Sequence, residues 1–167
     1  MGVHERSGRF AFDVKFDGLA LPFSEGLARV CDQGGWGFID HFGRFGVAPQ
    51  FEDARDFNEG LAAVKSLGKW GFVNKSGGFD IQPQFDSVGA FSEGFAAAES
   101  PATRSKIGFI DRLGRFVIAP SFGDTGRFLG ERCFVKTEDE IGYIDENGKF
   151  VWRGQYADIW ITSDLLL

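Results

Sequence analysis

The sequence lacks long hydrophobic runs. No stretch approaches the roughly 20 apolar residues that a membrane-spanning helix needs. Residues 1–16 alternate charged and aromatic side chains, without the apolar core of a secretory signal peptide. We therefore expect a cytoplasmic protein that does not contact a membrane.

Cysteine and histidine are also scarce, with 2 of each among 167 residues. Cys31 and Cys133 are too few and too far apart for a disulfide framework or a four-ligand zinc site. His4 and His41 have no metal-ligand spacing to each other or to a cysteine. Nucleophile elbows, phosphate loops, zinc-protease motifs and dinucleotide fingerprints are absent as well. These absences predict a protein with no metal, no cofactor and no enzymatic activity.

Positive charge is in deficit, since 18 Lys and Arg face 24 Asp and Glu, for a net charge of -6. Such a surface repels phosphate, which argues against nucleic acids and anionic membranes as ligands. A partner protein is therefore expected to be basic. Glycine (24) and phenylalanine (20) are abundant instead, as is typical of many short strands joined by glycine turns.

Three motifs recur in the same order along the chain. The segment 36–40, Trp-Gly-Phe-Ile-Asp, returns in related form at 70–74, 107–111 and 141–145. A Pro-Gln-Phe motif at 49–51 returns at 83–85, changes to Pro-Ser-Phe at 120–122 and weakens to Gly-Gln-Tyr at 154–156. A Phe-x-Glu-Gly motif occurs at 23–26, 57–60 and 91–94, whereas residues 128–131 exchange Glu and Gly. Such periodicity is the mark of a tandem repeat.

These motifs resemble the bacterial WG-containing repeat, a family named for its Trp-Gly pair and usually found in tandem. The resemblance extends from about Gly8 to about Asp158. It implies a repeat fold and assigns no catalytic residue, so no functional site is transferred to this chain.

The residues themselves predict an all-β fold. Alternation favours strands near 36–40, 44–48 and 61–65, with a positive-φ turn at Gly43 and Pro49 at a strand end or sheet edge. Each repeat is therefore expected to be a three-stranded β-meander that neighbouring repeats cover. The meanders are expected to stack as an open or partly closed array, with a closed propeller-like ring as the alternative. We expect one domain over 1–167, with partial units at about 1–35 and 141–167 and full units at 36–69, 70–106 and 107–140.

Most recurrent residues have a structural interpretation. The repeated Trp and Phe are expected in the core, because they follow the strand period. Glu25, Glu59 and Glu93 are expected to accept hydrogen bonds from nearby backbone N–H groups, and Asp40 and its counterparts to make Asx turns. Cys133 aligns with alanines and is expected to fill a small buried site.

The departures from the repeat are the candidate functional features. The linker 99–106 is three residues longer than the repeat requires and precedes the copy with the exchanged Glu and Gly, and insertions in repeat arrays map to loops. The candidate partner-binding residues are Arg104, Lys106, Arg132, Glu138, Asp139, Glu140 and Trp152. The leading hypothesis is a non-enzymatic protein–protein interaction module, for example an adaptor or a toxin-neutralising, immunity-type partner. The alternative is a carbohydrate or cell-wall binding module that uses exposed aromatics.

Overall fold

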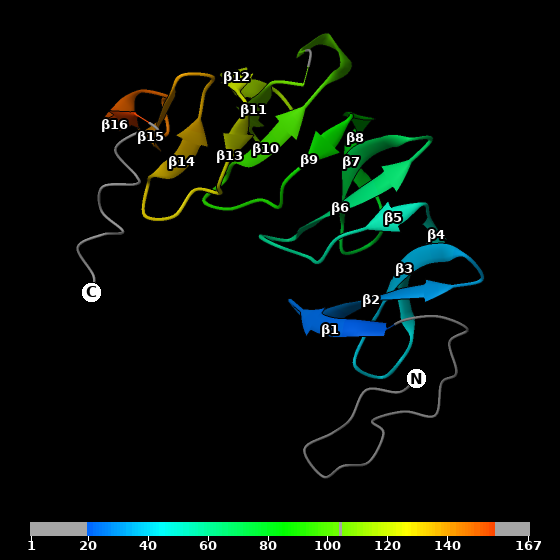
Figure 1. Cartoon of the computed structure of the whole chain (residues 1–167). Coiled ribbons are helices and arrows are strands. Elements are labelled where there is room, and N and C mark those ends of the chain that lie inside the picture. Colours follow the sequence, from blue (N-terminus) through cyan, green and yellow to red (C-terminus); the bar gives the residue numbers. More distant parts are fainter. Residues whose placement is uncertain (1–19, 104, 156–167) are drawn as a thin grey trace, which may run out of the picture. The chain divides into compact units, whose positions relative to one another are not determined.

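The described strands form four antiparallel sheets of four strands each (Figure 1). This computed structural model describes residues 20–103 and 105–155. Sheet I contains β1 (Ala20–Ser24), β2 (Leu27–Asp32), β3 (Gly35–Ile39) and β4 (Phe45–Phe51). Sheet II contains β5 (Asp53–Ala54), β6 (Leu61–Ser66), β7 (Lys69–Asn74) and β8 (Phe79–Phe85). Sheet III contains β9 (Ser87–Val88), β10 (Ala96–Glu99), β11 (Ile107–Ile110) and β12 (Phe116–Phe122). Sheet IV contains β13 (Asp124–Thr125), β14 (Cys133–Lys136), β15 (Glu140–Ile144) and β16 (Phe150–Gln155).

The all-β prediction is confirmed. Along the described residues, the single turn η1 (Pro101–Thr103) is the only helical element. The meander that was predicted with three strands has a fourth, which in sheets II, III and IV is a two-residue strand at the edge. The boundaries of the sheets do not coincide with those of the repeat units predicted from the sequence. For example, β6 lies at the end of the predicted unit 36–69 but pairs with β7 of the next unit.

The chain divides into two compact units, residues 1–85 with sheets I and II and residues 86–167 with sheets III and IV. In each unit one hydrophobic cluster lies between the two sheets. In the first, Phe38 of sheet I packs with Phe57, Ala62 and Val64 of sheet II, and the Phe38 and Phe57 ring centroids are 4.7 Å apart. Stacking of neighbouring repeats therefore buries the core, as predicted.

The second unit repeats this packing. Phe109 and Ile118 of sheet III pack with Phe128, Cys133 and Val135 of sheet IV. The rings of Phe109 and Phe128 meet edge to face, with centroids 5.0 Å apart. We call the face of each sheet that carries Phe38, Phe109 or their counterparts the forward face. In sheets I and III the next sheet of the same unit covers it. The buried position of Cys133 matches the sequence prediction.

The glycine of each Trp-Gly pair lies where the next strand passes closest. A Cβ atom on Gly37 would lie 2.6 Å from the Val47 carbonyl oxygen and 2.7 Å from the Pro49 nitrogen. The register of β3 with β4 shifts at this point, between the pairs Trp36–Phe51 and Phe38–Val47. The same shift recurs in sheets II and III. Because β4 is an edge strand, Pro49 costs no ladder hydrogen bond there, in agreement with the prediction.

The Glu-Gly motifs form tight hairpin turns in which both central residues have positive φ. Glu25 and Gly26 have φ angles of 51° and 89°, as a type I′ turn requires. The fourth copy keeps this geometry with the two residues exchanged, since Gly130 and Glu131 both have φ of 61°. The exchange that looks like a broken motif in the sequence therefore preserves the turn.

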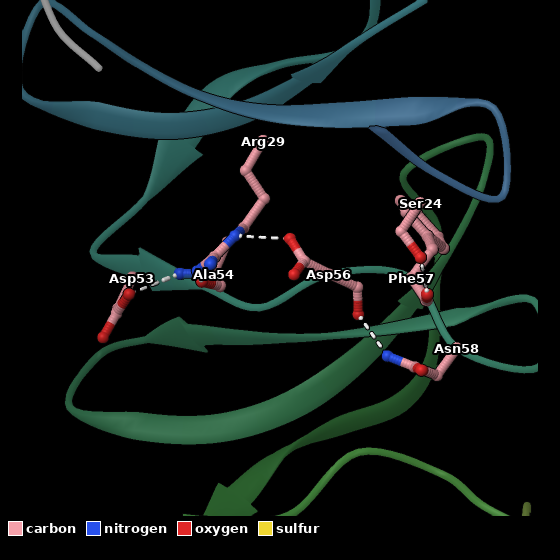
Figure 2. Close-up of polar contacts among 7 residues, drawn as sticks. All are labelled: Ser24, Arg29, Asp53, Ala54, Asp56, Phe57 and Asn58. Atoms are coloured by element: carbon pink, nitrogen blue, oxygen red, sulfur yellow. Dashed lines mark hydrogen bonds and ion pairs between the residues drawn. The ribbon is translucent and has the colours of Figure 1, made fainter. Parts of the chain in front are cut away.

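The residues of these turns bind the next sheet, and we call this pair of contacts the Ser-Glu clasp. Ser24 donates its hydroxyl proton to the Phe57 carbonyl at 2.6 Å (Figure 2), and the Glu25 carboxylate accepts the Gly60 N–H at 3.0 Å. In the second unit, Ser92 donates to the Phe128 carbonyl at 2.7 Å. Glu93 accepts the N–H groups of Gly130 and Glu131 at 2.6 and 2.8 Å, also in that unit. The glutamates thus do accept backbone N–H groups, but those of the next repeat and not of their own turn.

Sheet I adds a charged contact to this clasp. The Arg29 side chain extends from β2 to the segment between β5 and β6, where its Nε lies 2.7 Å from Asp56 Oδ1 (Figure 2). It also donates from Nη1 to the Ala54 carbonyl and lies over the Trp36 ring. Both atoms of the ion pair are buried and neither makes a hydrogen bond, so the attraction between the two charges is what offsets their burial.

Replacing a repeat glycine by alanine tests whether the close approach of the following strand requires glycine at this position. A Cβ on Gly108 would lie 2.5 Å from the Ile118 carbonyl oxygen and 2.8 Å from the Pro120 nitrogen, so backbone must move. We expect Gly108→Ala to lower the free energy of unfolding by about 2 kcal/mol, measured by urea denaturation. The matched control is Gly123→Ala, where the nearest atom to a new Cβ is 3.8 Å away and the change is expected to be neutral or slightly stabilising. Equal effects of the two substitutions would contradict the steric explanation.

The Ser-Glu clasp predicts a pH dependence. Burial opposes ionisation of Glu25, but hydrogen bonds from Lys75 and Gly60 and the Lys75 charge outweigh it and lower the Glu25 pKa below its ordinary value of 4.5. The ionised carboxylate therefore stabilises the fold above pH 4.5, and this contribution is lost as the pH falls through the lowered pKa. We expect Glu25→Gln to cost about 1 kcal/mol at pH 7 and less at pH 3, by denaturation at both pH values. Glu146→Gln, in an exposed turn, is the control, and a pH-independent loss for Glu25→Gln would contradict the prediction.

Candidate partner-binding face on the last sheet

The Asp at the end of each Trp-Gly strand organises the following turn. Asp40 Oδ1 accepts the N–H groups of Phe42 and Arg44 at 2.8 and 3.0 Å, and Asp111 and Asp145 repeat the pattern. Burial opposes ionisation of Asp40, yet these bonds and the Arg44 charge lower its pKa below the ordinary value. The predicted Asx turns are confirmed, which accounts for these carboxylates structurally.

Sheet IV lacks the side chains that clasp a following sheet. Leu129 occupies the position of Ser92, and Gly130 occupies the position of Glu93. Leu129 is 59% exposed, and Gly130 has no side chain that could accept a hydrogen bond. The fourth turn is therefore bound by the Ser-Glu clasp of sheet III, but it has no serine or glutamate at the positions that would bind a following sheet. The exchange of Glu and Gly at residues 130–131 is the sequence signal of this missing clasp.

A row of aromatic side chains crosses the forward face of sheet IV. Phe134, Tyr143 and Trp152 are direct partners across β14, β15 and β16. Their rings are in contact, with centroids 6.0 Å apart for Phe134 and Tyr143 and 6.2 Å apart for Tyr143 and Trp152. Tyr143 is 46% exposed and Trp152 is 51% exposed. Cross-strand aromatic pairs stabilise a sheet, but exposed pairs also form a binding surface.

The exposure of this row is a departure from the repeat. Phe38 and Phe109 occupy the position of Tyr143 in sheets I and III, and they are 0% and 1% exposed beneath the next sheet of their unit. None of the described residues covers Tyr143 in this way. Sequence comparison placed Trp152 outside the repeat motifs but did not single out Phe134 or Tyr143, because both lie at ordinary repeat positions.

An acidic hairpin borders the same sheet. Glu138 and Asp139 form the turn between β14 and β15, and Glu140 begins β15. Lys106, from the long linker, lies 2.6 Å from Glu138, and Arg153 lies 3.2 Å from Glu140. The hydrogen bond from Lys106 and its charge lower the pKa of Glu138 below the ordinary value. The structure thus brings together the linker and the acidic segment that the sequence had identified separately.

The predicted partner-binding residues do not all meet. Lys106, Glu138 and Glu140 cluster at the hairpin, and Asp139 is exposed at its tip. Trp152 lies on β16, in the aromatic row, three residues before Gln155, the partner of Glu140. Arg132 precedes β14 and so lies at the other end of that strand, roughly 13 Å from the hairpin. Arg104 lies outside the described residues.

The two cysteines differ in burial. Burial raises the pKa of the Cys133 thiol to about 12, so it is inert at neutral pH. Cys31 is half-buried and, like Cys133, unpaired. Within residues 20–103 and 105–155 no group of three or more His, Cys, Asp or Glu side chains could hold a metal ion. No helix in that part of the chain is both long and apolar enough to cross a bilayer.

One open hollow lies in the first unit. It is lined by the β2–β3 turn and by the end of β4, with Gln33, Gln50 and the half-exposed Phe45 on its walls. Gly35 occupies the position at which sheets II and III carry Lys69 and Lys106, so the side chain that covers the strand end there is missing. The hollow combines amide groups with one aromatic ring.

The family comparison agrees with the repeat architecture. The WG containing repeat matches residues 3–35, 36–70, 70–99 and 107–140. None of the curated proteins matches the chain. Among solved structures, the chain is similar to the crystal structure of a protein of unknown function from Bacteroides caccae, with 20% sequence identity and a TM-score of 0.42 over 83% of this chain. This chain spans 60% of that protein's chain. Since the repeat matches most of its length, the chain belongs to the WG containing repeat family.

Proposed function

We propose that this chain is a non-enzymatic protein-binding module, and that its contact surface is the forward face of sheet IV with the adjoining acidic hairpin. The observation that supports this most strongly is the aromatic row Phe134–Tyr143–Trp152, in which Tyr143 and Trp152 are exposed whereas the repeat buries Phe38 and Phe109. Exposed aromatic clusters of this kind are enriched at protein interfaces, where Trp and Tyr dominate the binding energy.

The charges beside the row favour a basic partner. The hairpin contributes Glu138, Asp139 and Glu140, while Lys106 and Arg153 neutralise two of these three carboxylates. The remaining negative charge, together with the net charge of -6, attracts a cationic segment and repels phosphate. An adaptor or a toxin-neutralising, immunity-type protein is the kind of cytoplasmic protein that we propose for this surface.

The absence of a catalytic role is part of the proposal. Its support is that the recurrent carboxylates have structural partners: Glu25 and Glu93 accept backbone N–H groups of the next sheet, and Asp40 organises a turn. Catalytic carboxylates instead occupy unequal environments that separate their pKa values.

Carbohydrate binding is the second candidate, because the hollow beside Gly35 places amide side chains near the half-exposed Phe45. An aromatic face with adjacent hydrogen-bonding groups suits a sugar ring. The two candidates use different units of the chain, so variants separate them.

Capture from a lysate of the native host tests the proposal when it is compared between variants. We expect a protein captured by the wild-type chain to be retained about tenfold more weakly by Trp152→Ala, and more weakly by Asp139→Lys as well. The matched controls are Phe42→Ala, an exposed aromatic in the first unit, and Glu146→Lys, an acidic residue in the β15–β16 turn at the other end of sheet IV. Both controls are expected to bind like the wild type. Capture that is insensitive to Trp152 and Asp139, or glycan-array binding without any captured protein, would refute the protein-binding proposal.

A further inference from the structure

Each of the four described sheets has two edge strands, and seven of these eight strands carry a feature that hinders pairing with a further strand. Three of them, β5, β9 and β13, are only two residues long. Four others contain a proline, which has no N–H to donate to a ladder: Pro22 in β1, Pro49 in β4, Pro83 in β8 and Pro120 in β12. Short edge strands and edge prolines keep β-sheet proteins from pairing with other chains.

Strand β16 is the exception among these edge strands. It has six residues, Phe150–Gln155, and none of them is proline. Gly154 stands at the position where β4, β8 and β12 have proline. The register with β15 is regular as well, since the four pairs that end with Glu140–Gln155 are consecutive, whereas β4, β8 and β12 shift register at this point of the ladder. Alternating N–H and C=O groups therefore point away from β15 along this strand.

The side chains of β16 leave its backbone accessible. Val151 and Trp152 are 47% and 51% exposed. Arg153 is the charged residue of the strand; it lies 3.2 Å from Glu140 and 4.2 Å over the Phe150 ring. Its charge is therefore partly compensated within sheet IV, which weakens the protection that a charged side chain gives to a sheet edge.

The charges around this edge favour one kind of added strand. Because Glu140 pairs with Gln155, the acidic hairpin lies at the end of the sheet where β16 ends. A strand beside β16 would lie about 10 Å from β15, a gap that a lysine or arginine side chain and a glutamate side chain span together. A second copy of this chain has the same net charge of -6 and is repelled by it. The edge therefore favours a basic segment of another protein over self-association.

We propose that β16 accepts an extended basic segment of the partner as a fifth strand of sheet IV. Backbone hydrogen bonds to β16 supply the affinity, and alternate side chains of the added strand lie beside Trp152 on the forward face. Lysine or arginine side chains of the segment bind the acidic hairpin. That β16 accepts a strand depends on the fold of sheet IV alone, whereas the assignment of this strand to the basic partner rests on the proposed function.

Peptide selection followed by NMR tests the strand pairing. A phage library of random peptides of about ten residues is selected on the full chain, and the tightest binder is added to the nitrogen-15-labelled full chain. We expect the selected peptides to be rich in Lys, Arg and β-branched residues and poor in proline. The peptide is expected to slow amide hydrogen exchange at least tenfold at alternate residues of β16, either 151, 153 and 155 or 152 and 154, because only alternate N–H groups point outward.

Several results of this experiment would overturn the proposal. Selected peptides that are acidic, or that leave the exchange of the β16 amides unchanged, would show a different chemistry or a different site. Slow exchange of every β16 amide in the chain alone would show that the edge is already occupied. A dimer in sedimentation that dissociates when the peptide is added would identify a second copy as the occupant.

Substitutions at matched edge positions test the same strand from the side of this chain. Val151→Lys places a positive charge on the β16 edge and is expected to weaken binding of the selected peptide at least threefold. Val117→Lys is the matched control, because Val117 has the same repeat position on β12 and is 48% exposed; it is expected to bind like the wild type. Val151→Thr keeps a β-branched side chain without the charge and is expected to bind normally too. Equal losses for the two lysine variants contradict pairing at β16.

The partner captured under the proposed function separates the two proposals. Trp152-dependent capture of a partner that leaves amide exchange in β16 unchanged overturns only the strand pairing. Slowed exchange at alternate β16 residues with the selected peptide, without any Trp152-dependent partner, overturns only the proposed function.

Discussion

The close passage of one strand over a glycine is the constraint on which each repeat depends. At Gly37, Gly71 and Gly108 the following strand comes so near that a Cβ atom would overlap backbone. The register shifts there, and a large residue on either side of the glycine contributes to the covered face. Without the glycine the edge strand would have to move outward, and the chain that follows it would no longer lie over the core. The glycine of the Trp-Gly pair is therefore a packing requirement.

The Ser-Glu clasp joins neighbouring sheets of one unit through hydrogen bonds. The apolar clusters bury residues such as Phe57 and Phe128 but do not fix the orientation of one sheet against the next, because hydrophobic burial is not directional. Hydrogen bonds from Ser24 and Glu25 to the next turn do have direction, and they recur in the second unit with Ser92 and Glu93. Because all fully buried side chains among the described residues are apolar, these polar contacts supply directional hydrogen bonds that the core does not.

Much of this architecture was predictable from periodicity. The strand at 36–40, the turn glycine at Gly43, the edge position of Pro49 and the burial of Cys133 all follow from alternation, turn chemistry and alignment of the repeats. The partners of Glu25 were not predictable, because a turn carboxylate has the same sequence whether it accepts N–H groups of its own turn or of a turn 35 residues away. Tyr143 was missed for a related reason, since burial depends on the neighbouring sheet and not on the residue.

The candidate site lies on the sheet whose turn offers no clasp. In sheets I and III, which offer one, Phe38 and Phe109 are buried under the next sheet of the same unit. Gly130 preserves the turn but has no side chain for an onward contact, and Tyr143 is exposed on the same sheet. Under the proposed function, charged residues at the border, such as Glu138 with Lys106, determine what that surface attracts. The changes at Leu129 and Gly130 thus remove the onward clasp while the turn and the four-stranded sheet that carries it are kept.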